Sequence, residues 1–380
     1  MTASNPAPLL PARTIEQVKR IAQAIRHQEA APLVGAGTSV RSGLPTWNDL
    51  IQRIILAWKA WDRSPARLLS PQNYVSLMRQ TFEDNNLAII SHLRNRINAT
   101  SGDTELSRFG QLLYSALYSR LPGPGRLFTP EPDHAHRHLV ALFSQYPHRM
   151  WTMNYDDLLE EAARLNGIAV RTLDPDHRLA SGDLLVEHIH GFLAPPGRLA
   201  GQPDPGEAPV VLAEDDYHAV SADVVGWTNR EVYRLFDEHR VLILGMSLSD
   251  PNLRRVLATL PESSASSVSS HFAVMRAIRE DELDLPRTRD SGRATYATCA
   301  NEIRSWYWQK RGVEIIELPD HDSLLPLLVR LRYESFGNCP GDLWKRAGAL
   351  GYSAIDPWRP DRQVTARHYL TAAVDALVKE

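Results

Sequence analysis

The chain is organised around one stretch near its N-terminus, Val34-Gly35-Ala36-Gly37-Thr38-Ser39-Val40-Arg41-Ser42-Gly43-Leu44-Pro45-Thr46-Trp47. It follows the apolar run 31–34 and leads into a helical pattern that Thr46 is suited to cap. A strand that ends in Gly-x-Gly turns tightly, and its backbone N–H groups can face an anionic diphosphate because no side chain blocks the approach. The N-terminus of the following helix adds partial positive charge. The stretch therefore predicts a phosphate-binding turn at the end of a strand.

The glycines alone leave an ordinary strand-to-helix turn open as the alternative. Val40 stands where the dinucleotide-binding fingerprint has its third glycine, which disfavours a common nicotinamide dehydrogenase. The sequence contains no Gly-x-x-x-x-Gly-Lys-Ser/Thr, so a P-loop is excluded.

Composition indicates a globular protein of about two to three domains, with 380 residues, 43% hydrophobic and 23% charged. The net charge of -3 gives no global field for nucleic acid, so direct nucleic-acid binding is not expected, although a local basic patch at Arg126, Arg137 and His138 stays open. The N-terminus has no secretory pattern, and no apolar run reaches the ~18 residues that a membrane span needs. We expect a cytoplasmic protein without a membrane contact.

No metal site is predicted. Cys299 and Cys339 are far apart and are expected to be reduced thiols, whereas a zinc ribbon needs four Cys or Cys/His ligands in paired short spacings. His134, His136 and His138 follow each other at i, i+2, which points them to different sides of a helix. We interpret them as the solvated start of a helix.

Apolar runs that alternate with helical patterns predict an α/β fold, a Rossmann-like doubly wound parallel sheet. The predicted strands are 31–34, 148–153, 168–172, 184–189, 209–212, 240–245, 271–276 and 313–318. The predicted helices around them are 14–30, one that Thr46 caps, 133–146, 156–166, 214–220, 226–238, 250–260, 299–311 and 321–334.

Helical patterns at 71–82, 84–98 and 105–120 fill an interval of about ninety residues before the second strand, far more than a βαβ crossover of about a dozen requires. We therefore predict a Rossmann domain built from 1–57 and 133–318, a helical insertion at 58–132, and a C-terminal helical extension at 319–380.

Three further motifs stand at predicted strand ends: Thr152-Met153-Asn154-Tyr155-Asp156, His188-Ile189-His190-Gly191, and Gly245-Met246-Ser247-Leu248-Ser249-Asp250-Pro251-Asn252. Open α/β sheets bind ligands at this end of their strands. Each motif also has a structural interpretation. Asp156 and Asp250 can cap the helices that follow, and a histidine at a strand end can serve packing alone.

The four motifs, in this order, resemble those of the sirtuin (silent-information-regulator) superfamily, in the version carried by prokaryotic sirtuin-like proteins. Gly-Ala-Gly-x-Ser followed by Ser-Gly-Leu-Pro-x-Trp is similar to the first motif of that family, and Thr-Met-Asn-Tyr-Asp is similar to its Thr-Gln-Asn-Ile-Asp. The Ser-x-x-Asp-x-Asn extension and the stretch 210–217 resemble the prokaryotic branch. The resemblance covers about residues 31 to 260.

The resemblance implies a pocket for NAD and assigns roles within it. Asn154 and Asp156 would lie against the nicotinamide ribose, and the turn 245–247 would hold the adenosine side. His190 would be the catalytic histidine, with His188 a less favoured substitute. A histidine with a pKa near 6.5 can accept a proton at neutral pH. The implied NAD-binding residues are Gly35, Ala36, Gly37, Thr38, Ser39, Ser42, Gly43, Pro45, Trp47, Asn154, Asp156, Gly245, Ser247, Asp250 and Asn252.

Two departures from the deacetylase sirtuins bear on the activity. The zinc-ribbon cysteines are missing, and Thr46-Trp47-Asn48 stands where those enzymes carry Asp-Phe-Arg. We therefore expect an NAD hydrolase that releases nicotinamide and ADP-ribose, without zinc, as a triggered effector of bacterial antiphage defence. An NAD-dependent protein deacylase and a non-catalytic NAD or ADP-ribose sensor are the alternatives.

Control of such an activity is expected to involve a homo-oligomer and a partner, an ATPase or a nucleic-acid-sensing protein as the resemblance suggests. The insertion or the loop 195–206 could shape the pocket entrance. The insertion's apolar residues Leu87, Ile90, Leu93 and Leu117 are expected to leave an exposed surplus for association. Their alternative role is to form the core of the insertion.

Overall fold

The computed structural model describes residues 12–60, 62–98, 105–120, 126–144, 148–173, 184–198, 210–260, 271–283 and 295–336. Cys339 and the chain beyond residue 336, which includes much of the predicted C-terminal extension, lie outside these ranges. The chain divides into two compact units, Ala31–Ser269 and Met1–Ala30 with Ser270–Glu380. The predicted three-part division remains a prediction.

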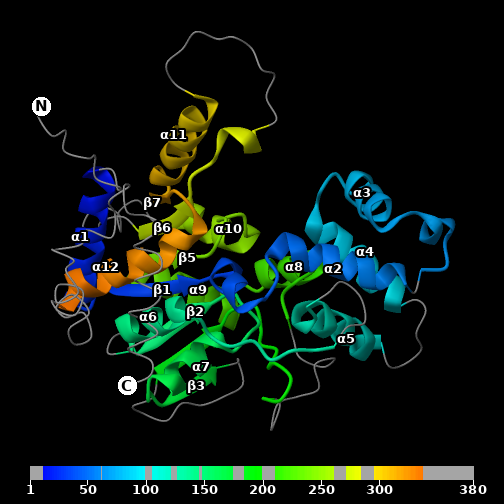
Figure 1. The fold of residues 1–380 in the computed structure, drawn as a ribbon, viewed down its shortest axis with the longest axis horizontal. Helices are drawn as coiled ribbons and strands as arrows, with labels where there is room; N and C mark the ends of the chain where they lie inside the picture. Colours follow the sequence, from blue (N-terminus) through cyan, green and yellow to red (C-terminus); the bar gives the residue numbers. More distant parts are fainter. Residues whose placement is uncertain are drawn as a thin grey trace, which may run out of the picture. The chain divides into compact units, whose positions relative to one another are not determined.

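The larger unit contains five strands: β1 (Ala30–Val34), β2 (Arg149–Thr152), β3 (Val170–Leu173), β4 (Leu184–His188) and β5 (Arg240–Leu244). They lie in the order β3-β4-β2-β1-β5 (Figure 1). β1, β2, β4 and β3 pair in parallel, with Val34 beside Thr152 and Thr152 beside His188. The order reverses at β1, because β2 lies on one side of it and β5 on the other. The predicted Rossmann-like parallel α/β fold is confirmed, and the reversal is the place where such sheets bind ligands.

The helices of this unit are α2 (Trp47–Lys59), α3 (Pro71–Thr81), α4 (Asn86–Asn98), α5 (Glu105–Tyr118), α6 (His134–Phe143), α7 (Leu158–Leu165), α8 (Glu214–Ala222), α9 (Trp227–Glu238) and α10 (Pro251–Thr259), with short 3-10 turns η1 (Ala36–Thr38), η2 (Val40–Ser42) and η3 (Pro65–Leu68). Thr46 caps α2 as predicted, since its hydroxyl accepts from the Asp49 N–H. Gly167 ends the turn after α7 with φ +70°, a conformation that favours glycine.

The predicted strand at 209–212 is wrong. Residues 210–212 are not part of any strand, although the Val211 N–H donates to the His190 carbonyl at 2.9 Å. The apolar run reflects burial of Leu212 and Ala213 against the helices of the insertion rather than pairing in the sheet.

The helices of the insertion are not a separate layer of the unit. Figure 1 shows α3, α4 and α5 gathered beside α2 and α8. Their buried side chains form one apolar cluster with Tyr155, Leu158 and Leu193, which follow β2 and β4. The expected exposed surplus is therefore wrong for Ile90, Leu93 and Leu117, which are all buried, because these residues complete that shared core. Leu87 is half-buried.

The smaller unit contains α1 (Ala12–Arg26), β6 (His271–Arg276), η5 (Glu280–Glu282), α11 (Tyr296–Gln309), β7 (Val313–Leu318), η6 (His321–Ser323) and α12 (Leu324–Phe336). β6 and β7 pair in parallel, and α1 is fastened to β7 by an Arg20–Glu314 ion pair at 2.8 Å. The predicted helix 299–311 begins earlier, at Tyr296, because Thr295 caps it. Cys299 is a free, exposed thiol. Among the helices of the described ranges, none is long and apolar enough to cross a membrane.

Candidate active site

A pocket of about 450 Å³ lies in the larger unit where β1, β2, β4 and β5 end. Eleven of the predicted site residues line it: Gly35, Ala36, Ser39, Pro45, Trp47, Asn154, Asp156, His190, Gly245, Ser247 and Asp250. Strand ends thus bring together motifs that are up to about two hundred residues apart in the chain. Gly37, Thr38, Ser42, Gly43 and Asn252 do not line the pocket.

The glycines hold two turns against each other. Gly35 donates its N–H to the Leu244 carbonyl at 2.8 Å, and Gly37 donates to the Gly245 carbonyl at 2.9 Å. A Cβ on Gly245 would lie 2.7 Å from both the Gly35 oxygen and the Thr38 nitrogen, and Gly245 has φ +67°. The expectation that the Gly35 and Gly37 N–H groups face a phosphate is therefore wrong, because both groups are bonded to the turn after β5. The glycines permit a close approach of two backbones.

The other predicted residues outside the pocket support these turns. The Thr38 hydroxyl donates to the Gly35 carbonyl at 2.8 Å, and Gly43 ends η2 with φ +89°. Asn252 is buried in α10, where its side-chain oxygen accepts from Arg255 at 2.7 Å. These contacts account for Thr38, Gly43 and the Asn252 oxygen, whereas Ser42 Oγ and Asn252 Nδ2 are buried without a hydrogen-bond partner.

Ser39, Asn154 and Asp156 form a buried chain of hydrogen bonds. The Asn154 amide donates to the Ser39 hydroxyl at 3.0 Å, and that hydroxyl donates to Asp156 Oδ2 at 2.9 Å. Asp156 Oδ1 accepts from the Leu158 N–H at 3.2 Å, so both of its oxygens are engaged. Burial raises the Asp156 pKa, against the opposing effects of His136, the Leu158 N–H and Ser39. Asn154 Oδ1 is buried and has no partner, so it is available to a molecule in the pocket.

His190 stands beside Asp250 and Tyr217. Its Nε2 lies 3.5 Å from Asp250 Oδ2 and makes no hydrogen bond of normal length. Its ring meets the Tyr217 ring edge-on, with centroids 5.7 Å apart. Burial lowers the His190 pKa, and the Asp250 carboxylate opposes that shift. The ring is therefore held as the neutral form at neutral pH, which is the form that can accept a proton.

His188, two residues earlier, is fully paired. Its Nε2 lies 2.8 Å from Glu160 Oε1, and its Nδ1 lies 2.7 Å from the Asn154 carbonyl oxygen. Burial lowers its pKa, but Glu160 and the Asn154 carbonyl outweigh that effect and the pKa is raised. His188 does not line the pocket.

Several pocket residues were not predicted. The residues next to Tyr217 in the sequence do not indicate that it lines the pocket, although it belongs to the stretch 210–217 that resembles the prokaryotic branch of the family. The turn between α3 and α4 supplies Asp84 and Asn85, the start of α4 supplies Asn86 and Leu87, and α5 supplies Leu117. These residues come from the insertion, which therefore shapes the pocket. Of the loop 195–206, residues 195–198 do not line it and the structure describes no more of that loop.

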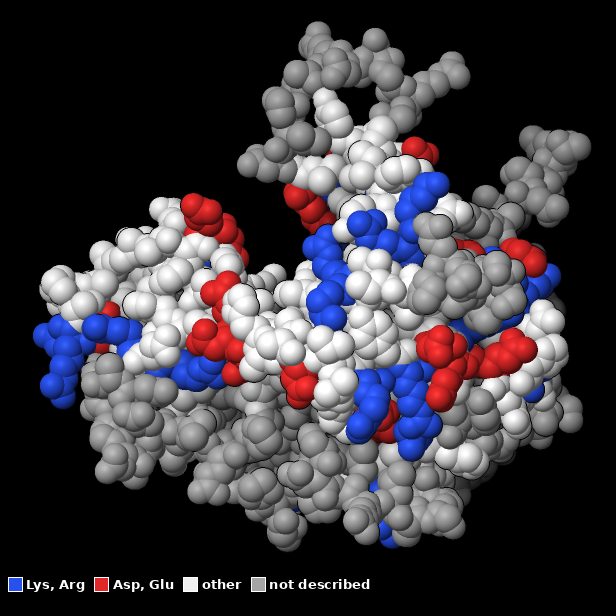
Figure 2. Space-filling model, turned by 180° about the vertical axis from the view of Figure 1, so that it is seen from behind, with Lys and Arg blue, Asp and Glu red and all other residues white. Residues whose placement is uncertain are grey.

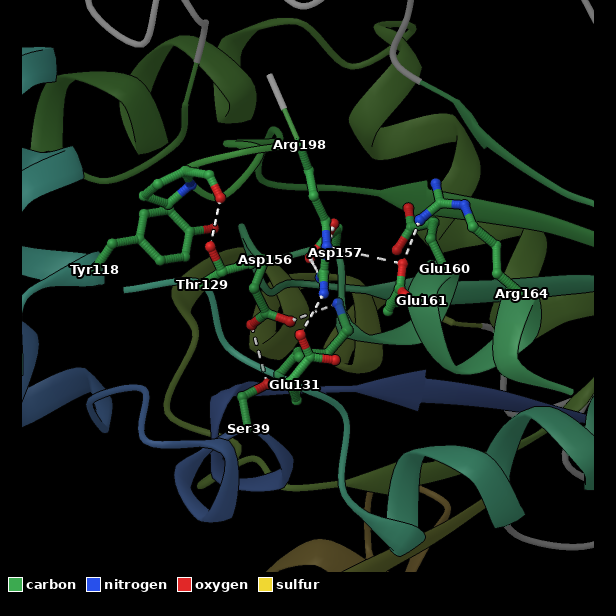
Figure 3. A network of polar contacts seen from close by, with 12 residues as sticks. Ser39, Tyr118, Thr129, Glu131, Asp156, Asp157, Glu160, Glu161, Arg164 and Arg198 are labelled. Atoms are coloured by element: carbon green, nitrogen blue, oxygen red, sulfur yellow. Dashed lines mark hydrogen bonds and ion pairs between the residues drawn. The ribbon is translucent and has the colours of Figure 1, made fainter. Parts of the chain in front are cut away.

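The segment after His190 is tied down by a polar network (Figure 3). The Tyr118 hydroxyl donates to the Leu193 carbonyl at 2.5 Å, and Arg198 binds Asp157 at 3.1 Å and Glu131 at 3.0 Å. Burial raises the Asp157 pKa to about 7, although Arg198 acts in the opposite direction. The network joins this segment to α5 and to the N-terminus of α7.

The three clustered histidines are not a solvated helix start. His136 and His138 are buried in α6, and His136 Nδ1 lies 2.7 Å from Asp133 Oδ1 as part of a capping box. That interpretation is corrected because α6 packs against α7, which buries this part of the helix. Within the described ranges, no group of three or more His, Cys, Asp or Glu side chains is arranged to hold a metal ion.

These observations define a Rossmann-like domain with a pocket at its switch point, into which the polar residues of the motifs are collected. The model of the SIR2-like domain matches residues 148–316 of this chain. The match includes three of the four motifs and begins after the glycine turn.

Two curated relatives are similar over most of this chain. "NAD(+) hydrolase ThsA" of Enterococcus faecium is 22% identical over 336 residues, which is 83% of this chain and 57% of the relative. "NAD(+) hydrolase ThsA" of Acinetobacter baumannii (strain 532279) is 24% identical over 266 residues, which is 69% of this chain and 45% of the relative. The chain spans about half the length of these relatives.

Proposed function

We propose that this protein hydrolyses NAD to ADP-ribose and nicotinamide in the pocket at the switch point. The observation that carries the proposal is the pairing of a neutral, buried histidine, His190, with the unpartnered Asn154 Oδ1 in one pocket. A buried polar atom without a partner costs about 1–3 kcal/mol, which a ligand hydrogen bond would recover. The names of the two curated relatives support the same substrate.

The reaction needs little acid help. The bond between ribose C1′ and the pyridinium nitrogen breaks, its electron pair stays on that nitrogen, and neutral nicotinamide leaves. Positive charge develops on the ribose as in an oxocarbenium ion, which the carbonyl dipole of Asn154 would stabilise. A water oxygen then bonds to C1′ and loses a proton to His190. Asp156 would orient Ser39 and Asn154, because both of its oxygens are already bonded.

The test is turnover of NAD by the pure protein, followed by chromatography of nicotinamide and ADP-ribose. His190→Ala should lower kcat by about 10²–10⁴-fold, since a positioned base typically contributes that much. Asn154→Ala should be similarly impaired and folded. His218→Ala is the matched control, because His218 is exposed on α8 and does not line the pocket.

Unchanged turnover in His190→Ala would overturn the mechanism. Nicotinamide release that depends on an acylated peptide would favour the deacylase alternative, and NAD binding without release would favour a sensor.

We also propose that the protein acts in antiphage defence as an oligomer, with an ATPase or nucleic-acid-sensing partner that opens the site. Exposed Leu68 and Leu77 in the insertion, rather than the residues first expected, are available to a contact. Figure 2 shows Lys and Arg as well as Asp and Glu on the face that it draws, and His138, one of the three residues of the basic patch left open above, is buried. Light scattering and NAD turnover across a concentration series test the assembly, and a fully active monomer would rule it out.

A further inference from the structure

We propose that Asp250, steadied by Tyr217, is the positioning residue of His190: its carboxylate accepts from Nε2–H and so leaves Nδ1 as the basic nitrogen in the pocket. The inference rests on the proposed function for its kinetic consequences. It assigns Asp250 a role other than the contact with NAD that the resemblance implied.

The two oxygens of Asp250 have separate tasks. Oδ1 accepts from the Leu253 N–H at 2.7 Å and caps α10. Oδ2 accepts from the Tyr217 hydroxyl at 2.7 Å and lies 3.5 Å from His190 Nε2. The cap explains the aspartate in part, since asparagine or serine would cap equally well. It does not explain why the second oxygen is buried between a tyrosine hydroxyl and an imidazole nitrogen, in a side chain only 8% exposed.

Tyr217 fixes this arrangement from two directions. Its hydroxyl holds Oδ2, while its ring packs edge-on against the His190 ring at 5.7 Å between centroids. α8 is itself held to the insertion, because Arg94 on α4 binds Asp216 at 2.8 Å. The imidazole is thereby confined between one aromatic edge and one carboxylate.

The charges around His190 point to Asp250 as its partner. Asp250 is the charged group that acts on the His190 pKa, opposing burial. Two further titratable groups lie close to the pair, Tyr217 on α8 and Tyr155 after β2. Burial raises the pKa of both hydroxyls, helped by the Asp250 carboxylate at Tyr217 and by the Asp216 carboxylate at Tyr155. Both tyrosines are therefore neutral at physiological pH. Asp216 itself accepts from the Leu212 and Ala213 N–H groups.

A neutral imidazole has one N–H donor and one acceptor nitrogen. A carboxylate at Nε2 favours the tautomer with the proton on Nε2, and Nδ1 is then the acceptor that can take a proton from water or a ribose hydroxyl. The carboxylate also stabilises the imidazolium that results. Proton balance is kept, because the proton that water loses is held on Nδ1 until it leaves to solvent.

The variant Asp250→Asn separates the positioning of His190 from the two alternative roles of Asp250, which are capping α10 and binding NAD. An asparagine oxygen can still cap Leu253, so its amide N–H₂ would face Tyr217 and His190 Nε2 and would force the proton onto Nδ1. We expect kcat to fall by about 10²–10⁴-fold with KM changed by less than about threefold. The acid limb of the pH profile of the remaining activity should move to lower pH, because the carboxylate that raised the His190 pKa is gone.

Two further variants complete the experiment. Tyr217→Phe keeps the ring and removes the hydroxyl, so kcat should fall by about ten- to a hundredfold, the usual worth of a hydrogen bond to a charged group. Asp320→Asn is the control, since Asp320 also caps a helical turn, in the other unit, and should leave turnover unchanged. A raised KM with unchanged kcat and an unmoved acid limb in Asp250→Asn would overturn the proposal, because Asp250 would then bind the ligand.

The pairing has a readout that does not need turnover. Long-range ¹H–¹⁵N spectra of ¹⁵N-histidine protein, with His190→Gln to assign the signal, report the tautomer directly. We expect Nε2–H in the wild type and Nδ1–H in Asp250→Asn, and the same tautomer in both would overturn the proposal. If the wild type does not cleave NAD, the proposed function fails while this spectrum still tests the pair.

Discussion

His188 and His190 are two buried histidines at the end of β4, and their environments differ. Both nitrogens of His188 are engaged, by Glu160 and by the Asn154 carbonyl, and its pKa is raised. His190 has no hydrogen bond of normal length at Nε2, lines the pocket, and has a lowered pKa.

The difference separates a structural histidine from a reactive one. A buried side chain whose hydrogen-bonding atoms are all paired with protein atoms makes the site more rigid. A buried side chain that has an unpaired hydrogen-bonding atom can exchange a proton with a ligand. His188 nevertheless helps to shape the pocket, because it binds the backbone carbonyl of Asn154. The position of a histidine along the strand does not distinguish a structural from a reactive one. Each prediction below tests whether the hydrogen-bond partners of the two histidines do.

The largest expected effect is on stability. His188→Ala should lower the free energy of unfolding by about 3–5 kcal/mol, because it leaves Glu160 as an uncompensated buried charge. His190→Ala should change it by less than about 1 kcal/mol, since the ring gives up no normal hydrogen bond and faces a pocket. Urea unfolding of both variants measures this, and equal losses would contradict the comparison.

The strands that carry this site, and the motifs at their ends, could be predicted from the sequence because they depend on local patterns. Apolar runs mark β1, β2, β4 and β5, and the polar motifs stand at their ends, where a parallel sheet collects them. It could not predict the partners. Glu160 lies on α7 with no motif around it, and Tyr217 reaches His190 only through the packing of α8.

The errors have the same origin. The run at 209–212 has the pattern of a strand, but its described residues Val210 and Leu212, with the adjacent Ala213, pack into the apolar cluster of the helices instead of the sheet. The glycine N–H groups have the geometry to bind phosphate, but their bonds to Leu244 and Gly245 depend on a strand two hundred residues away. The burial of His136 and His138 depends on the packing of α6 against α7, which the spacing of the histidines does not contain.

A second, smaller effect is expected from Glu160→Gln. The amide keeps the shape and can still bond Thr172, which donates to Glu160 at 2.7 Å, but it no longer supplies a charge to His188. The free energy of unfolding should fall by about 1–3 kcal/mol. His188 should then titrate at lower pH in ¹⁵N-histidine spectra, and His190 should be unaffected. A shift at His190 instead would show that the two histidines share one network.

The two histidines should also give opposite pH dependences of stability. The raised pKa of His188 gives a stabilisation that is complete below about pH 6.5 and is lost as pH rises through its folded pKa. The lowered pKa of His190 costs stability as pH falls below about 6.5. The deficit of His188→Gln relative to wild type should therefore shrink as pH rises, and His190→Gln should gain on the wild type as pH falls.

Each slope is at most about 1.4 kcal/mol per pH unit for one proton. Urea unfolding at intervals from pH 5.5 to 8.5 measures both variants against the wild type. Slopes of the same sign would mean that the two environments do not differ in the way their contacts indicate.

The smallest expected effect is none at all. Incubation with a chelator should leave Tm unchanged, and elemental analysis should find no stoichiometric zinc. The reason is that the nitrogens of the histidines near the pocket face protein atoms in an arrangement that does not suit zinc. His188 uses both nitrogens, and His190 faces a single carboxylate oxygen at 3.5 Å, whereas zinc requires about four ligands at 2.0–2.3 Å. One tightly held zinc per chain would reopen the deacylase alternative and would place a ligand set in the part of the chain outside the described ranges, Cys339 included. Loss of that zinc should then lower Tm in the wild type and in His190→Ala alike, which would separate it from the chemistry of the pocket.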